Sequence, residues 1–109
     1  MERPVQRIAF IIRLKPGADP VEYKRRHDEI WPEMLEALRA AGLRNYSIFL
    51  DGLRLFAYFE VDDHERARSI ISADATNARW QAYMADMIDH DVDPETGGLR
   101  LLPMMFHVD

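Results

Sequence analysis

The sequence predicts an α+β fold, in which a four-stranded antiparallel sheet carries two helices on one face in the ferredoxin-like order β-α-β-β-α-β. Three observations support it. The chain opens with a run of alternating apolar residues, which is the period of a strand. Two further strand-like runs are joined by Asp51-Gly52, a strong hairpin signal. Amphipathic helical segments stand before and after this hairpin, where they can connect the strands.

The first strand is expected over residues 5–14. Its strongly apolar positions alternate with other residues, as in a strand that buries one face; they are Ile8, Phe10, Ile12 and Leu14. Pro16-Gly17 then ends the run.

The first helix is expected over residues 20–41. Asp19 suits the N-cap, Pro20 suits the first helical position, and Gly42 suits the C-cap. One side of this helix is apolar, and His27 lies near the middle of that side.

The hairpin is expected to pair residues 43–50 with residues 53–61, with Asp51-Gly52 at the two central turn positions. A second helical region is expected from residue 62 to about residue 88, with a break near Ala73-Asp74. Residues 99–108 predict the last strand, which Pro103 restricts to an edge or a bulge.

The predicted sheet is apolar on both faces. In the third strand Leu55 and Phe59 lie on one face, and Phe56 and Tyr58 lie on the other. Two helices can cover only one of these faces, so the other face predicts an interface between two copies of the chain. We expect a homodimer; a monomer whose loops cover the second face is the alternative.

Composition excludes several classes of function. The 109 residues fit one domain, residues 1–109. A net charge of −5 disfavours binding to nucleic acid or to an anionic membrane. The absence of cysteine excludes disulfides and Cys-ligated zinc. No apolar run approaches the ~20 residues that span a bilayer, so we expect a soluble, cytoplasmic protein.

No metal or cofactor is expected. The histidines do not show metal-ligand spacing such as HExxH, and Asp89-His90-Asp91 is better explained as a solvated acidic loop. Glycine-rich phosphate-binding motifs are also absent from the sequence.

His27 is the strongest candidate for chemistry, because an imidazole on an apolar helix face loses hydration and needs a hydrogen-bonding partner. Tyr23 and Trp31 lie one turn before and after it, and the second helical region carries Trp80-Gln81-Ala82-Tyr83. Aromatic faces beside polar groups suit a sugar ring. Plain core packing explains the same spacing equally well, so the pattern alone leaves both interpretations open.

The segment Tyr23-Lys24-Arg25-Arg26-His27-Asp28-Glu29-Ile30-Trp31-Pro32-Glu33 resembles the L-rhamnose mutarotase family. The similarity continues through residues 45–51, 55–60 and 79–84. Members of this family are dimeric α/β barrels of ferredoxin-like topology that interconvert the α and β anomers of L-rhamnose without a cofactor. The resemblance therefore implies an isomerase that acts on a small monosaccharide as a homodimer.

The resemblance also implies site residues. The proton-donating histidine of the family corresponds to His27, and its sugar-contacting residues correspond to Tyr23, Tyr46 and Trp80. Gln81 stands where the family often has a second tryptophan. We expect Gln81 to bind substrate through hydrogen bonds, which favours a more hydroxylated or differently shaped sugar. The expected substrate is L-rhamnose or a related 6-deoxy or aldohexose sugar.

Mutarotation needs an acid at the ring oxygen and a base at the anomeric hydroxyl. An imidazole with a pKa of about 6.5 can serve as either at neutral pH. We expect His27 to act as the general acid, Tyr23 or Tyr46 to position the sugar hydroxyls, and Trp80 to stack on the sugar. The base stays open between a water, a tyrosine hydroxyl and the same histidine.

Two other hypotheses are retained. One is a cofactor-free dimeric α/β-barrel enzyme that acts on a small aromatic substrate. The other is a non-catalytic dimer that binds a monosaccharide.

Overall fold

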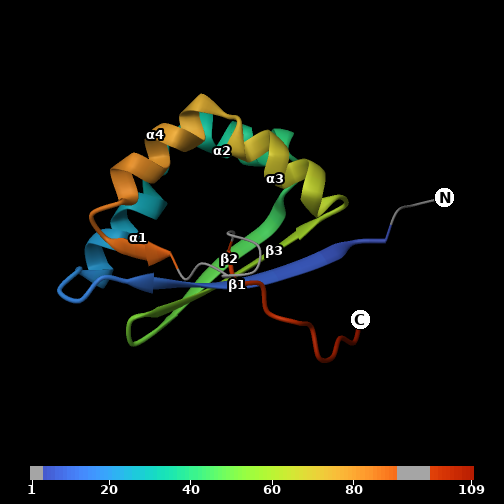
Figure 1. Cartoon of the computed structure of the whole chain (residues 1–109), viewed down its shortest axis with the longest axis horizontal. Helices are drawn as coiled ribbons and strands as arrows, with labels where there is room; N and C mark the ends of the chain where they lie inside the picture. The colour runs from blue at the N-terminus through green and yellow to red at the C-terminus, as the bar shows by residue number, and fades with distance from the viewer. Residues whose placement is uncertain (1–3, 91–98) are drawn as a thin grey trace.

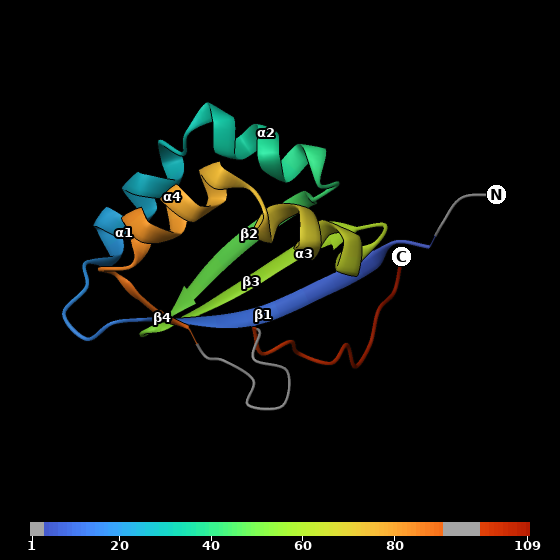
Figure 2. The same cartoon turned by 45° about the horizontal axis from the view of Figure 1, so that its top comes forward.

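A computed structural model of the chain describes residues 4–90 and 99–109. Its elements follow in the order β1 (Gln6–Leu14), α1 (Pro20–Asp28), α2 (Pro32–Ala40), β2 (Arg44–Asp51), β3 (Arg54–Val61), α3 (His64–Ser72), α4 (Ala75–Met84) and β4 (Ile88–His90). The strands form one four-stranded antiparallel sheet in the order β2-β3-β1-β4. The helices arch over one face of this curled sheet (Figure 1 and Figure 2). The predicted α+β fold class is confirmed.

Each of the two predicted helical regions is divided into two helices. The break between α3 and α4 was expected, and Asp74 caps α4 by accepting a hydrogen bond from the backbone nitrogen of Asn77 at 3.0 Å. The prediction of one continuous helix over residues 20–41 was wrong. Pro32 disfavours the helical conformation at Trp31, which has φ −61° and ψ 137° and begins a new helix.

The predicted ends of the first helical region are confirmed. The Asp19 side chain accepts a hydrogen bond from the backbone nitrogen of Val21 at 2.9 Å. At the other end Gly42 has φ +92° and donates its backbone N–H to Arg39. Leu43 donates its backbone N–H to Leu38, so the last carbonyls are satisfied in a Schellman motif.

The turn between β2 and β3 lies one residue later than expected. Asp51 pairs with Arg54, so Gly52 and Leu53 occupy the central turn positions. Gly52 has φ +62° and Leu53 has a negative φ, the pattern of a type II′ turn rather than one with two positive φ values.

The prediction of a last strand over residues 99–108 was wrong. The edge of β1 pairs instead with β4, which begins at Ile88, because the helical region ends at Met84. Leu101 forms an isolated bridge with Phe10, and the backbone nitrogen of Leu102 donates to Ala9. Pro103 has no N–H, so it cannot continue the pairing.

The core lies between the helices and the inner face of the sheet. Along β3, Leu55, Ala57, Phe59 and Val61 are buried in strict alternation with less buried residues. They pack against the buried side chains of the helices, which include Tyr23, Met34, Trp80 and Met84. The C-terminal residues 103–109 run along the side of the sheet that faces away from the helices (Figure 1 and Figure 2).

Replacing Gly42 with alanine tests the helix end that leads into β2. A Cβ at this position has ordinary contact with Val61 at 3.8 Å, so the cost comes from the positive φ rather than from a clash. We expect Gly42→Ala to lower the free energy of unfolding by about 1 kcal/mol in urea titrations. Asparagine tolerates positive φ, so Gly42→Asn should cost less; equal stability of the alanine variant and the wild type would contradict this account.

Candidate active site

Ring-bearing side chains from α1, the α1–α2 junction and α4 contact one another in a chain. The ring centroids of Tyr23 and His27 lie 4.3 Å apart, and those of His27 and Trp80 lie 5.4 Å apart with the rings nearly perpendicular. Trp31 lies 5.2 Å from Trp80 and 5.5 Å from Tyr83. We call these five residues, Tyr23, His27, Trp31, Trp80 and Tyr83, the aromatic cluster.

Local structure explains why these rings meet. Tyr23 and His27 are four residues apart on α1 and therefore share one side of it. The break at Pro32 leaves Trp31 in an extended conformation between two helices, where its ring reaches Trp80. The sequence analysis placed Trp31 on the apolar stripe and Tyr83 beside Trp80, but it assigned neither residue to the site.

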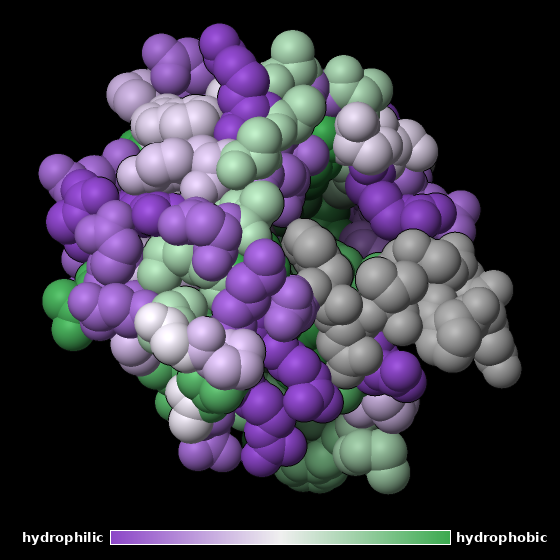
Figure 3. Space-filling model, turned by 60° about the vertical axis from the view of Figure 1, so that its left-hand side comes forward, coloured by the Kyte–Doolittle hydropathy of each residue, from purple (hydrophilic) through white to green (hydrophobic). Residues whose placement is uncertain are grey.

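Burial differs within the aromatic cluster. Tyr23 is 7% exposed and Trp80 is 6% exposed, whereas His27 is only half-buried. His27 therefore combines a largely apolar environment with partial exposure to solvent. Figure 3 shows that the surface is hollowed on one side of the protein and that the visible floor of the hollow is apolar.

The hydrogen bond of His27 defines its neutral form. Its Nδ1 lies 3.0 Å from the backbone carbonyl oxygen of Tyr23. A carbonyl oxygen can only accept, so Nδ1 carries the proton and the neutral ring has a free lone pair on Nε2. Burial lowers the pKa of His27, while the Tyr23 carbonyl and the charge of Asp28 oppose this effect. At neutral pH the imidazole is therefore a proton acceptor through Nε2.

The two tyrosines predicted for the site are hydrogen-bond donors, whereas His27 is an acceptor through Nε2. Burial raises the pKa of Tyr23 to about 12. Burial also raises the pKa of Tyr46, and the Tyr23 phenol adds to that rise. Both phenols keep their protons at neutral pH and can donate hydrogen bonds.

The Tyr46 ring packs on the core from β2, although the residue as a whole is 38% exposed. Its ring lies 5.5 Å from Phe59 and 6.5 Å from Phe10, two core residues on the helix-facing side of the sheet. These contacts place the Tyr46 ring on the same side of the sheet as the helices.

The structure does not bring Gln81 to the aromatic cluster. Its side chain is exposed, and its amide nitrogen donates to Asn77 Oδ1 at 3.3 Å, one turn earlier on α4. Of the residues predicted for the site, Tyr23, His27 and Trp80 form a chain of ring contacts. Tyr46 packs on Phe10 and Phe59 on the helix-facing side of the sheet, and Gln81 lies apart.

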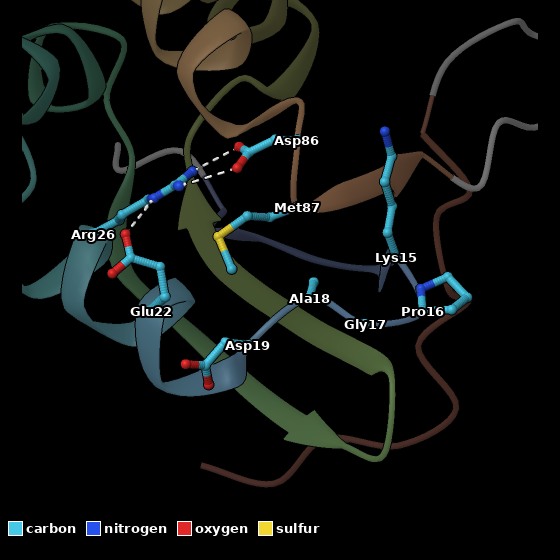
Figure 4. A pocket seen from close by; sticks show the side chains of 9 residues that line it. All are labelled: Lys15, Pro16, Gly17, Ala18, Asp19, Glu22, Arg26, Asp86 and Met87. Carbon is cyan, nitrogen blue, oxygen red and sulfur yellow. Dashed lines mark hydrogen bonds and ion pairs between the residues drawn. The ribbon is translucent and has the colours of Figure 1, made fainter.

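Arg26 is a residue that the sequence analysis missed, because helical spacing placed it on the polar side of the helix. Its side chain is only 12% exposed and forms ion pairs of 2.8 Å with Glu22 and with Asp86. It also donates to the backbone carbonyl of Tyr83 at 3.0 Å, and its guanidinium lies 4.6 Å from the centroid of the Tyr83 ring. Figure 4 shows Arg26 between the two carboxylates.

These contacts tie α1 to the C-terminal end of α4. The charge-assisted hydrogen bonds from Arg25 and Arg26 lower the pKa of Glu22 to about 2. The surface pocket that Arg26 borders is lined by Glu22, Asp86, Met87 and residues 15–19, and no member of the aromatic cluster lines it (Figure 4). We therefore assign Arg26 to holding the two helices together rather than to contacting a ligand.

Residues 4–90 and 99–109 contain neither a metal-binding group of side chains nor a membrane-spanning helix. No three His, Cys, Asp or Glu side chains of this part of the chain gather where they could hold a metal ion. No helix of the same part is long and apolar enough to cross a membrane. The prediction of a loop at Asp89-His90-Asp91 was wrong for its first two residues, which pair with β1 as part of β4; Asp91 lies outside the described residues.

Comparisons with known proteins connect this geometry to a family. The profile of the L-rhamnose mutarotase family matches residues 7–108. The chain belongs to the L-rhamnose mutarotase family. The resemblance noted in the sequence is therefore confirmed.

Individual relatives agree with the family assignment. The chain is 43% identical over 107 residues to L-rhamnose mutarotase of Burkholderia orbicola, covering 96% of this chain and all of the relative. It is 39% identical over 102 residues to L-rhamnose mutarotase of Tolumonas auensis, covering 92% of this chain and 96% of the relative.

A solved structure extends the similarity to three dimensions. The crystal structure of L-rhamnose mutarotase from Formosa agariphila superposes with a TM-score of 0.75 at 30% identity, covering 95% of this chain and 99% of that chain. These mutarotases favour neither an enzyme for aromatic substrates nor a non-catalytic binder.

The protonation state of His27 can be measured directly by NMR titration of its ring nitrogens. We expect a pKa below 6.5 and a neutral ring that carries its proton on Nδ1, because burial opposes the charge and the Tyr23 carbonyl accepts from Nδ1. The charge of Asp28 favours the imidazolium, so Asp28→Asn should lower the pKa further. A pKa above 6.5, or a proton on Nε2 in the neutral ring, would refute this assignment.

Proposed function

We propose that this protein interconverts the α and β anomers of L-rhamnose and that His27 carries the proton between the reacting oxygens. The observation that carries the proposal is the His27 imidazole, which the Tyr23 carbonyl orients within the aromatic cluster, half-buried and with Nε2 free. A related 6-deoxy or aldohexose sugar would react by the same chemistry. Membership of the L-rhamnose mutarotase family supports the choice of reaction.

The hydrogen bond on Nδ1 suggests the order of the proton transfers. Neutral His27 first accepts the proton of the anomeric hydroxyl on Nε2, while the bond between C1 and the ring oxygen breaks and C1 becomes a carbonyl. The resulting imidazolium then donates this proton to the ring oxygen, which completes the open-chain aldehyde.

Closure on the opposite face of the aldehyde produces the other anomer. After rotation about the C1–C2 bond, the hydroxyl formed from the former ring oxygen attacks C1. The same two proton transfers then run in reverse. His27 is then a base before it is an acid. Among the three candidates left open for the base, this geometry favours the same histidine.

The remaining residues of the site are proposed to bind the sugar. Tyr23 and Tyr46 are protonated phenols, so each can donate a hydrogen bond to a sugar hydroxyl. Trp80 supplies an apolar surface for C–H groups of the ring. Substrate binding by Gln81 stays a prediction, since its side chain is directed along α4.

Removing the imidazole tests the catalytic role of His27. In saturation-transfer NMR, the wild type should accelerate anomeric exchange of L-rhamnose, and His27→Ala should lose about 10²–10⁴-fold of that acceleration. The wild-type kcat/KM should also fall as the pH drops through the lowered pKa of His27, because the imidazolium cannot accept the hydroxyl proton.

The matched control is Lys24→Ala, which removes an exposed side chain from the same helix. Exchange rates in His27→Ala that equal those of this control would end the assignment. Repeating the assay with L-fucose, L-mannose and L-lyxose identifies the preferred sugar.

We also propose that the protein functions as a homodimer. The outer side of the sheet and the C-terminal segment expose large apolar residues, which are Phe49, Leu101, Met104, Met105, Phe106 and Val108. Phe106, for example, is 82% exposed. Large apolar residues exposed in this number are typical of protein interfaces, and the resemblance to dimeric α/β barrels suggests a second copy as their partner.

Sedimentation over a range of concentrations tests the dimer. We expect the double variant Met105→Asp, Phe106→Asp to raise the dimer dissociation constant at least about tenfold, because it places charge in an apolar interface. Val21→Asp is the control, since Val21 is an exposed apolar residue on α1. A wild type that sediments as a monomer at all concentrations would rule out the dimer.

A further inference from the structure

Leu43 and Tyr46 both face the helices, although they are three positions apart. Leu43 is buried in the core, and the Tyr46 ring packs on Phe59 and Phe10. Side chains in a regular strand alternate between the two faces. If the geometry of β2 continued back to Leu43, the residue directly before it, Leu43 and Tyr46 would face opposite ways. The chain must therefore depart from regular strand geometry between Leu43 and Tyr46.

The departure is a bulge in β2. Arg44 pairs with Glu60 and Ser47 pairs with Tyr58, so two residues of β2 lie opposite the single residue Phe59. Those two residues are Asn45 and Tyr46. One extra residue reverses the alternation, which is what allows Tyr46 to face inward together with Leu43.

Asn45 has the backbone conformation that the bulge requires. Its φ is +53°, and no other non-glycine residue in the described parts of the chain has a positive φ. Asparagine is one of the few residues with a Cβ that adopts this conformation readily, whereas β-branched residues strongly disfavour it.

Glu60 holds the Asn45 side chain from the neighbouring strand. Asn45 Nδ2 donates to Glu60 Oε1 at 3.0 Å, and the Tyr58 hydroxyl donates to Glu60 Oε2 at 2.9 Å. The hydrogen bonds from Asn45 and Tyr58 lower the pKa of Glu60, so the carboxylate stays charged. Arg44, on the other side of Asn45, forms an ion pair with Asp62 at 2.7 Å. Side-chain contacts with β3 and the residue that follows it thus hold the bulge at Asn45 and at Arg44.

We infer that Asn45, held by Glu60, is a positioning residue for the reaction, because it fixes the bulge that turns Tyr46 to the helix-facing side of the sheet, where the aromatic cluster lies. This inference rests on the proposed function. Asn45 acts through Tyr46 and is not proposed to touch the sugar. A displacement of about 1 Å in a substrate-positioning group can cost up to about 10²-fold in rate.

A double-mutant cycle tests whether Asn45 acts through Tyr46. Asn45→Val disfavours the positive φ, and we expect it to lower kcat/KM for anomeric exchange by at least about tenfold. In the Tyr46→Phe background the same change should cost less than about twofold, because the hydroxyl that it misplaces is already gone. Equal losses in the two backgrounds would overturn the inference.

Two further variants complete the activity experiment. Ser47→Val introduces the same side chain at the next outward-facing position of β2 and should leave exchange unchanged. Asn45→Gly keeps the conformation but loses the hydrogen bond to Glu60, so a smaller loss is expected. If the valine variant does not fold, the loss in Asn45→Gly must still disappear in the Tyr46→Phe background, and persistence there overturns the inference.

A second measurement is independent of activity. In the wild type, NMR should show nuclear Overhauser contacts between the Tyr46 ring and the Phe59 and Phe10 rings, and in Asn45→Val these contacts should weaken or vanish. Unchanged contacts in that variant would overturn the positioning role even if the protein is an active mutarotase. Lost contacts in a protein without exchange activity would uphold the placement of Tyr46 and reject the proposed function.

Discussion

The guanidinium of Arg26 joins the two helices that carry most of the candidate site. It pairs with Glu22 in its own helix and with Asp86 just beyond α4, and it lies over the ring of Tyr83. His27 directly follows Arg26 in the chain, and Trp80 precedes Tyr83 by nearly one turn. The contact between the imidazole and the indole therefore depends on a charged bridge that lies outside the aromatic cluster.

Features set by neighbouring residues could be predicted from the sequence. The Asp19 cap, the Gly42 helix end and the alternation along β1 depend on a few adjacent residues, and each was found as expected. The missed features depend on competition between segments. Pro32 interrupts an amphipathic pattern that is otherwise continuous, and the edge of β1 is taken by Ile88–His90. Hydrophobic periodicity indicates which side of a segment is buried, but it does not indicate which of two segments pairs with the edge strand of a sheet.

The candidate site also combines features that nearby residues determine with features that depend on distant segments of the chain. Helical spacing alone placed His27 beside Tyr23, but the tautomer of His27 depends on a side-chain rotamer that spacing does not determine. The roles of Arg26 and Asn45 come from partners that are 60 and 15 positions away in the chain. Both residues look like ordinary surface residues in the sequence. Their importance becomes visible only when the fold brings Asp86 and Glu60 beside them.

The rings proposed to face a bound sugar carry no formal charge at neutral pH. His27 is held neutral by its lowered pKa, and Tyr23 and Tyr46 are held neutral by their raised pKa values. An anionic ligand would lose its hydration there without gaining an opposite charge, which is unfavourable. Arg26 offers no compensation, because two carboxylates already engage it. If these rings line the sugar site, the cost of desolvation disfavours sugar phosphates and uronic acids there, and no residue dedicated to rejecting them is needed.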